Sequence, residues 1–586
     1  MRTQGDVYHP DFLSYDVGVG AGLAQQHIDS DDVTGWNSGT LDEYDLSAQL
    51  LRAKPYSATV GATKSEGLIA RQFLGSLQTE RETQNAAVFL RSESLPMTFQ
   101  YSHSDTSQDG FTALARDFFA REDDRFRYSV NHDFSERSRA HFDFDHTESF
   151  QQSVGATITT QADTYTASHD HAFGNDSRHR LDSFFNYVDQ TGTFDFESMR
   201  WQERLRLQHT PSLLSRYDFR LTDLQRETLS SRELRGQVGL ERRLYESLVT
   251  TLDGFGSETD LDEQGTLTQY GGVLGLTYRK KNPWGLLLSS YNASLTASDQ
   301  AGGGAMGIVT DETHTATELV PIQLNRTNID VSTIRVKNAS GVFFQEGDDY
   351  TVTESNGRVF LNVTTLGLFI PNITEGQELF VDYNFIIEPQ RREDTLRQSL
   401  TLRERFRNGA SVYYAYRRQD QDVSSTLADI TADQYSVNTL GADYSNRGLF
   451  LLAEYSNEES TQIPSTSTRF EGRYRWLVGP RTSASVGASS QWLSFGEPDA
   501  HDVTLYRGNA QVLSRLTDAY SISATLDYRN EDDTRFGLTE GIQLDAELQY
   551  QYRQLRATVG AELSSLNRRD DQINSVFLYM RLQRRF

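Results

Sequence analysis

Apolar and polar residues alternate along most of this chain. Between Leu396 and Phe406, one face carries mainly leucine side chains, while the other face is polar and basic. Successive side chains of a β-strand point to opposite faces, so this period of two predicts strands with one apolar face. The predicted strands are about fourteen to sixteen residues long, whereas strands of globular proteins contain about five or six.

Turn-forming residues divide the chain at regular intervals. Short turns such as Lys54-Pro55 and Asn282-Pro283 are separated by long polar stretches such as GSETDLDEQGT, and each interval of about 35 to 41 residues holds two predicted strands. Outer-membrane barrels have short periplasmic turns, longer extracellular loops and an even number of strands. The sequence therefore predicts an all-β fold, a large antiparallel transmembrane β-barrel of about 26 strands.

Residues 298–392 interrupt this pattern, because their apolar runs are shorter than those of the predicted barrel strands. Short β-branched runs are separated there by turns such as Asn-Ala-Ser-Gly and Ser-Asn-Gly. We predict a small inserted β-sandwich, Ig-like, in an extracellular loop. The expected organisation is an N-terminal periplasmic segment (1–11), a first barrel part of about 15 strands (12–297), the insert (298–392) and a second barrel part of about 11 strands (393–586).

Composition agrees with a barrel. Mean hydropathy is −0.58 and 37% of the residues are hydrophobic, and a barrel strand needs only one apolar face. No stretch approaches the roughly 18 to 20 apolar residues of a membrane helix. The 82 acidic residues against 56 basic ones argue against nucleic acid as a partner. The lack of Cys excludes disulfides and covalent c-type haem, so we expect this chain to bind no cofactor.

The last twelve residues, SVFLYMRLQRRF, place apolar residues on one strand face and end on an aromatic residue. The pattern resembles the carboxy-terminal assembly signal of Gram-negative outer-membrane proteins, and it is carried by Leu578, Met580, Leu582 and Phe586. This resemblance to bacterial outer-membrane β-barrels implies a location in the outer membrane. It also implies outer-membrane lipids and the barrel assembly machinery as partners.

Histidines gather between residues 132 and 179. His141, Asp143 and Asp145 share one strand face, and His169 and His171 share another, in spacings that could hold a metal ion. Imidazoles at the membrane interface explain the same pattern, and we favour that explanation. The sequence contains no G-x-S-x-G, P-loop or H-E-x-x-H motif, so we expect no enzyme activity and no catalytic residues.

Arginines lie opposite the apolar faces of several predicted strands. Seven of them are expected to face the lumen: Arg216, Arg220, Arg235, Arg243, Arg397, Arg403 and Arg405. A lumen with such charged ladders suits either a charged protein plug or a water-filled pore.

Barrel size raises the question of what fills the lumen. Barrels of 16 to 18 strands leave an aqueous channel and 22-stranded transporters are plugged, so an open barrel of about 26 strands would be a large hole. The insert is small and lies on the wrong connection for a plug of the TonB-dependent type. We therefore expect a partner protein or folded-in loops in the lumen.

In architecture the chain is similar to the porin-like sheath barrels of trans-outer-membrane electron conduits and to the lipopolysaccharide translocon, which a lipoprotein plugs. The first resemblance implies a sheath or scaffold around a multihaem c-type cytochrome, with haem in the partner and electron transfer across the membrane. Two alternatives are a self-occluded porin or export channel for solutes or polysaccharide, and a surface scaffold for adhesion or assembly.

Overall fold

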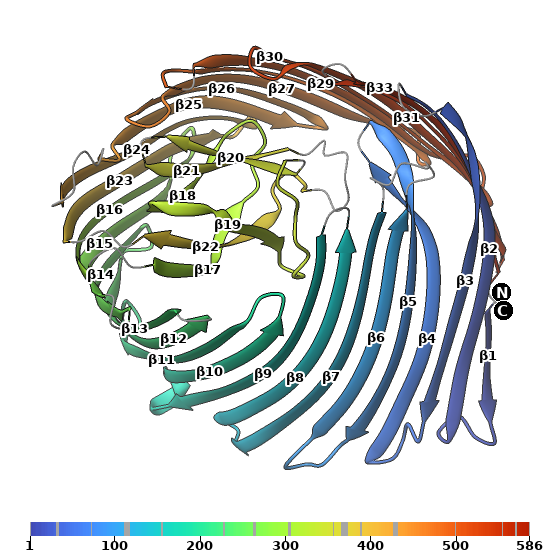
Figure 1. The fold of residues 1–586 in the computed structure, drawn as a ribbon, viewed down its shortest axis with the longest axis horizontal. Helices are drawn as coiled ribbons and strands as arrows, with labels where there is room; N and C mark the ends of the chain where they lie inside the picture. Colours follow the sequence, from blue (N-terminus) through green and yellow to red (C-terminus); the bar gives the residue numbers. More distant parts are fainter. Residues whose placement is uncertain are drawn as a thin grey trace.

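Long strands of alternating polarity close into an antiparallel barrel in the computed structural model (Figure 1). The structure describes the chain except residues 1, 31–33, 72, 110–117, 154–155, 227–228, 262–264, 303–305, 348, 356, 365–372, 387–389, 426–431, 499, 554, 569–570 and 585–586. Fifteen wall strands precede the insert and eleven follow it in the described ranges, so the predicted 26 strands are confirmed.

The wall strands before the insert are β2 (Leu13–Ser30), β3 (Thr34–Leu50), β4 (Tyr56–Arg71), β5 (Leu74–Leu90), β6 (Met97–Asp109), β7 (Phe118–Ser135), β8 (Ser138–Ser153), β9 (Ala156–Phe173), β10 (His179–Gly192), β11 (Phe196–Thr210), β12 (Leu213–Arg226), β13 (Leu229–Leu244), β14 (Leu248–Asp260), β15 (Gly265–Lys281) and β16 (Gly285–Gly302). A single 3-10 turn, η1 (Asn175–Ser177), lies between β9 and β10.

The wall strands after the insert are β23 (Arg391–Phe406), β24 (Ala410–Ser425), β25 (Tyr435–Asn446), β26 (Leu449–Ser460), β27 (Ser465–Val478), β28 (Thr482–Phe495), β29 (His501–Arg515), β30 (Tyr520–Asp533), β31 (Gly537–Tyr552), β32 (Leu555–Arg568) and β33 (Asp571–Arg584).

The two ends of the chain close the wall together. β33 pairs with β2 from Ile573↔Ser30 to Arg584↔Val19, and the short strand β1 (Arg2–Val7) pairs with the rest of the same β2 edge, from Gly18 to Leu13. The termini lie side by side in Figure 1. The first strand thus begins at Arg2 instead of after residue 11, because the β2 edge that β33 leaves uncovered offers free ladder groups to a neighbouring segment.

Apolar side chains cover the outer face of the wall. Leu234, Val238 and Leu240 of β13 are exposed, as are Leu578, Met580 and Leu582 of β33. Their strand neighbours, such as Arg235, point into the barrel. No helix in the described ranges is long and apolar enough to cross a membrane. A closed barrel with an apolar outer band is the outer-membrane architecture, and the chain is an outer-membrane β-barrel.

The insert consists of two antiparallel three-stranded sheets around one apolar core. The sheets follow the orders β17-β22-β19 and β18-β21-β20. Their strands are β17 (Met306–Thr315), β18 (Ile322–Thr327), β19 (Ile329–Asn338), β20 (Tyr350–Ser355), β21 (Arg358–Val363) and β22 (Glu378–Ile386). Leu324, Ile334, Leu361, Leu379 and Val381 form the centre of the core. The six described strands are one fewer than in the seven-stranded Ig sandwich; the two small sheets are present, and the Ig-like part stays a prediction.

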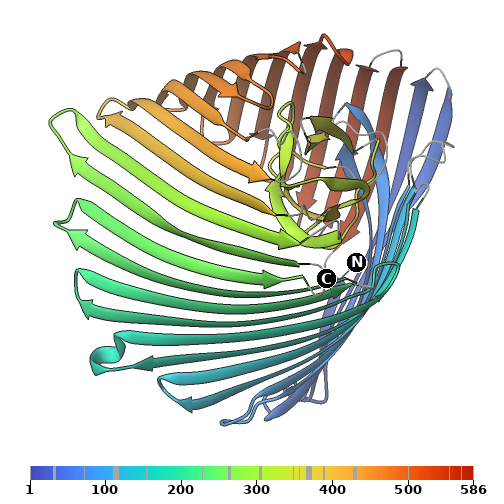
Figure 2. The ribbon, with the colours of Figure 1, turned by 60° about the vertical axis from the view of Figure 1, so that its left-hand side comes forward.

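The insert lies inside the ring of wall strands (Figures 1 and 2). Its place in the sequence after β16 therefore does not keep the insert out of the ring. A circular barrel of 26 strands about 4.8 Å apart and tilted by about 40° has a diameter of about 50 Å, or about 40 Å between inward side chains. A compact domain of roughly 80 residues is about 30 Å across, so the insert alone does not fill the lumen.

A hairpin of the wall occupies part of the remaining space. β3 pairs with β4 only from Leu50↔Ala58 to Tyr44↔Lys64, while β4 continues to pair with β5 as far as Arg71↔Leu74. Beyond Lys64 β4 separates from β3, while β5 stays paired with β6 as far as Gln78↔Asp109. The end of the hairpin lies against β32 and β33, and Figure 1 shows it bending inward. A two-stranded ribbon is about 10 Å thick. This thickness matches the difference between the lumen width of about 40 Å and the insert width of about 30 Å.

We expect the barrel to fold without the insert. β16 and β23 are paired along their length, from Gly285↔Phe406 to Gln300↔Arg391. Asn-Gly in place of residues 302–390 therefore forms, together with Ala301, a three-residue hairpin loop that keeps the register. The shortened protein should keep the heat-modifiable gel mobility of a folded barrel. An aggregated product that never shows this mobility would mean that the insert is needed for wall assembly.

Candidate functional site

A buried ion cluster around Glu318 joins the insert to the wall. Arg529 of β30 donates from Nη2 to Glu318 Oε1 at 2.9 Å and from Nη1 to Glu318 Oε2 at 3.1 Å, and Arg507 of β29 donates to Oε2 at 2.5 Å. Arg529 also pairs with Glu531. The side chains of Glu318 and Arg529 are only 8% and 2% exposed. We call these four residues the latch.

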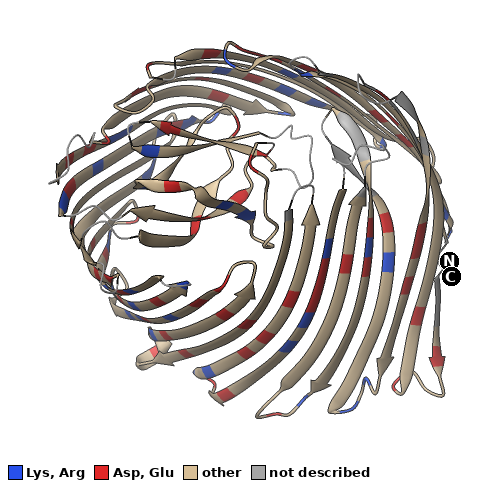
Figure 3. Ribbon diagram, viewed as in Figure 1, with Lys and Arg blue, Asp and Glu red and all other residues tan. Residues whose placement is uncertain are grey.

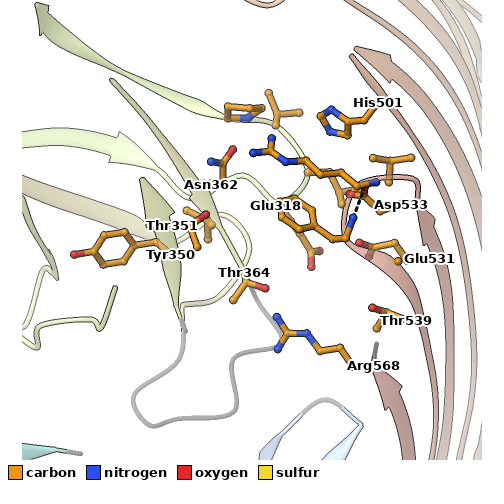
Figure 4. Close-up of a pocket in the computed structure, with 18 of the residues that line it drawn as sticks. Glu318, Tyr350, Thr351, Asn362, Thr364, His501, Glu531, Asp533, Thr539 and Arg568 are labelled. Carbon is orange, nitrogen blue, oxygen red and sulfur yellow. Dashed lines mark hydrogen bonds between the residues drawn. The ribbon is translucent and has the colours of Figure 1, made fainter. Parts of the chain in front are cut away.

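A cavity of about 160 Å³ lies beside the latch, between insert and wall (Figure 4). Tyr350 and Asn362 line it from the insert, and His501 and Asp533 line it from the wall. Asp533 Oδ1 accepts hydrogen bonds from the backbone N–H groups of residues 535 and 536 at 2.7 and 3.1 Å. Leu319 of the insert also packs against an apolar cluster of β28 and β29. The insert therefore touches this part of the wall through both the latch and apolar contacts, and the cavity marks where the packing is incomplete.

Apolar contacts hold the opposite side of the insert. Val342 packs against Leu77 at the inner end of the β4–β5 hairpin and against Phe119 of β7. The ring of Phe343 lies 5.1 Å from that of Phe194, which follows β10. Gln151 of β8 donates to the Phe343 carbonyl at 3.4 Å. Insert, hairpin and wall thus meet at one cluster, on the side of the lumen away from the latch.

The tip of the β4–β5 hairpin is anchored to the far side of the closure. Phe73 is 1% exposed and packs against Leu566 of β32. Its backbone N–H donates to Gln543 Oε1 of β31 at 2.7 Å. An ideal Cβ on Gly541 would lie 2.5 Å from Phe73 Cγ, so the ring of Phe73 fits here only because residue 541 is glycine.

Glu312 stabilises the interior of the insert as a carboxylate. Burial raises its pKa, but hydrogen bonds to its ionised form outweigh burial, and the pKa lies below the ordinary value of 4.5. His314 Nε2 lies 2.6 Å from Glu312 Oε1, and the backbone N–H of Asn325 donates to that oxygen at 2.9 Å. The Tyr383 hydroxyl donates to Oε2 at 2.5 Å.

The structure places the arginines of the sequence prediction on the strand face opposite the exposed apolar side chains. Arg216 pairs with Asp253 at 3.2 Å, Arg243 pairs with Glu241 at 3.3 Å, and Arg403 pairs with Asp443. Arg397 donates to Gln419 at 2.6 Å, and the Arg235 guanidinium lies 4.9 Å from the centre of the Phe255 ring. Arg220 and Arg405 take the same face by strand alternation. Acidic and basic positions are interspersed along the wall (Figure 3).

The two histidine groups face opposite sides of the wall. His141 contacts Asp143, and Asp143 and Asp145 pair with Arg127 and Arg125 of β7. His169 and His171 of β9 stack 6.1 Å apart, and His171 stacks on Phe173 at 5.8 Å. In the β8–β9 register His141 lies opposite Ser168, which points away from His169.

Another group of potential metal ligands in the described ranges consists of His103, Glu122 and Asp124. His103 Nδ1 lies 3.0 Å from Asp124 Oδ1, which also accepts a hydrogen bond from the Tyr101 hydroxyl at 2.7 Å. Sequence reasoning missed this group because its members come from β6 and β7 and only strand register brings them together.

Comparisons with known proteins add the following. No family model matches the chain, and no curated protein matches it. Among solved structures, the siderophore receptor PirA from Pseudomonas aeruginosa is similar with 11% identity, 98% of this chain and 81% of that chain covered, and a TM-score of 0.38. The unliganded ferric citrate transporter FecA is 9% identical, with 97% of this chain and 78% of that chain covered and a TM-score of 0.36. The copper transporter OprC is 8% identical, with 97% of this chain and 80% of that chain covered and a TM-score of 0.36. Scores this low support no conclusion about function.

Glu318→Gln should weaken the attachment of the insert to the wall. Removing one partner of a buried ion pair costs about 3 to 5 kcal/mol, and we expect the lower end because Glu531 remains beside Arg529. Hydrogen exchange of insert peptides in detergent measures the loss. The matched control is Arg481→Gln, since the exposed pair Arg481 and Asp518 contributes at most about 1 kcal/mol. Equal exchange in both variants would contradict the latch.

Acid should loosen the insert through Glu312. A carboxyl group with a depressed folded pKa contributes stability above its unfolded pKa and loses it as pH falls through the folded pKa. Exchange of insert peptides, corrected for the intrinsic effect of pH, should therefore rise below pH 4.5. In Glu312→Gln the insert should exchange faster at pH 7 and respond less to acid. An unchanged acid response in that variant would assign the effect to other carboxyl groups.

Proposed function

We propose that the protein is a self-occluded outer-membrane channel for polar solutes. The observation that carries the proposal is the seating of the insert inside the barrel, with the latch on one side and the Val342 cluster on the other. A plug formed by the chain itself leaves no need for a partner to seal the membrane. Partial withdrawal of the insert or of the hairpin opens a water-filled path beside the other part.

Charge sets the preference of the channel. The chain carries a net charge of −26, and the lumen-facing arginines named above whose ion pairs are described have acidic partners. A wide aqueous lumen in an acidic wall raises the local concentration of cations. The channel therefore favours cations and neutral polar solutes over anions.

The expected roles as a sheath for a multihaem cytochrome and as a surface scaffold stay predictions. A sheath needs a partner in the same lumen, so a cytochrome has to share the space with insert and hairpin or displace them. No described contact favours one of these roles over the channel.

Planar bilayer recordings test the proposal. The native protein should show a small conductance with rare larger steps, and the variant that lacks residues 302–390 should show a large and stable conductance. Currents should be cation-selective, and the selectivity should fall as salt rises from 0.1 to 1 M, because the Debye length falls from about 10 Å to about 3 Å. Low conductance of a folded insert-free barrel would overturn the proposal.

The same preparation tests the sheath prediction. Protein purified from native membranes should be colourless if the chain acts alone. A haem absorbance band that copurifies in constant proportion would favour the sheath over the self-occluded channel.

A further inference from the structure

The wall is incomplete beside β3. β2 pairs with β3 from Leu13↔Leu50 to Asp29↔Thr34, but on the other edge the pairing with β4 stops at Tyr44↔Lys64. Within the described strands, no strand pairs with the β3 edge from Thr34 to Glu43. The opening lies at the loop end of the wall, at the place where the β4–β5 hairpin leaves it.

Side chains of the hairpin replace part of the missing ladder. The backbone N–H of Asp42 donates to Glu66 Oε2 at 2.9 Å. Gln78 Nε2 donates to the Thr40 carbonyl at 3.1 Å. Both bonds satisfy groups of the β3 edge that strand pairing would otherwise use. If β4 returned to the β3 edge, backbone hydrogen bonds between the two strands would replace these two side-chain hydrogen bonds.

The β3–β4 register continues without conflict beyond Lys64. Extending it places Ser65, Glu66 and Gly67 opposite Glu43, Asp42 and Leu41, and the inward and outward faces stay the same. Gly67 leaves room beside Leu41. The extension also puts the Glu66 and Asp42 carboxylates side by side, and like charges directly opposite each other are destabilising. This repulsion disfavours the extended register, although Lys64, which pairs with Glu66, offsets part of it.

The hinge lies between Lys64 and Gly67. Lys64 Nζ contacts Glu66 Oε1 at 3.1 Å and Glu80 Oε1 at 2.7 Å on the same ribbon. Arg581 of β33 donates to the Glu66 carbonyl at 2.6 Å and pairs with Glu43. Above Lys64 β4 has separated from β3, but β5 stays paired with β6 as far as Gln78↔Asp109. The end of the ribbon is held through Phe73 and Leu77.

We propose that the β4–β5 hairpin is the gate of the channel, with two positions. In one, the end of the hairpin leans over the inner face of the closure and Phe73 packs on β31 and β32. In the other, β4 pairs with the edge of β3, the wall becomes continuous and the space beside the insert opens. The inference rests on the proposed channel function and assigns its regulated step to the hairpin instead of the insert.

Cysteine pairs test the two positions, because the native chain contains no Cys. Phe73→Cys with Gly541→Cys fixes the inner position, since Phe73 Cγ lies 2.5 Å from an ideal Cβ on Gly541. Asn37→Cys with Arg71→Cys reports the wall position, where the extended register makes them neighbours. β31 lies four strands from β3 across the closure, roughly 19 Å at about 4.8 Å per strand. Residue 71, two residues from Phe73, therefore cannot reach residue 37 in the inner position.

The expected results are specific to each pair. Oxidation of the 73–541 pair should abolish the large conductance steps, and reduction should restore them. The 37–71 pair should crosslink in native membranes and hold the larger conductance, and Glu66→Gln should speed this crosslink by removing the repulsion with Asp42. Val486→Cys with Ala510→Cys, neighbours on β28 and β29, is the control that should crosslink without changing conductance.

Two results would overturn the gate: no 37–71 crosslink under conditions that fully oxidise the control pair, or unchanged large steps after 73–541 oxidation. If either occurs while the insert-free variant conducts, the gate fails and the channel stands. If neither the native protein nor the insert-free variant conducts, the proposed function fails. The crosslinking itself needs no conductance, so it still decides whether the hairpin moves.

Discussion

The requirement that every backbone group inside the bilayer be hydrogen-bonded governs this structure. A spanning sheet meets that requirement only by closing on itself, and here the closure brings β33 and β1 to the same edge of β2. Closure of 26 strands then sets the width of the lumen at about 40 Å. Insert and hairpin follow from that width, because a hole of this size cannot stay open in a membrane that must hold its contents.

Neither part of the plug is sufficient alone. A domain of roughly 80 residues is about 30 Å across, so the insert leaves a gap, and a hairpin that is itself a piece of the wall occupies part of it. The hairpin can leave the wall only above the apolar band. Around Leu46 and Val60 its strands are still paired and carry exposed apolar residues, whereas beyond Lys64 the outward positions of β4 and β5 include Glu66, Glu80 and Glu82. Water can therefore satisfy the vacated edge at the level where the pairing stops.

The alternation of side chains and the spacing of turns were enough to predict the strands, their number, the place of the insert and the outer-membrane location. These are local features, and a strand pattern repeats the same information many times along the chain. The sequence could not predict that the insert lies inside the ring of wall strands. Glu318 meets Arg529 across 211 residues and Phe73 meets Gln543 across 470, and no local pattern relates such pairs. The seven arginines illustrate the intermediate case, because alternation assigned them a face while their partners came only from the register.

The chemistry of the plug interface is suited to separation. If apolar surface alone held insert and wall together, each withdrawal would expose matching apolar patches to the lumen water, and such patches bind one another or foreign molecules. Here the apolar contacts of Val342 and Leu319 with the wall are supplemented by the latch, whose residues Glu318, Arg507 and Arg529 regain hydration when they part. Burying these charges costs much of what their attraction returns, so the latch adds little net affinity. It acts mainly by disfavouring other positions of the insert. A misplaced insert that covers Arg529 would leave this arginine buried without its partner Glu318. The proposed channel, which closes by itself, needs one correct closed position more than it needs a strong one.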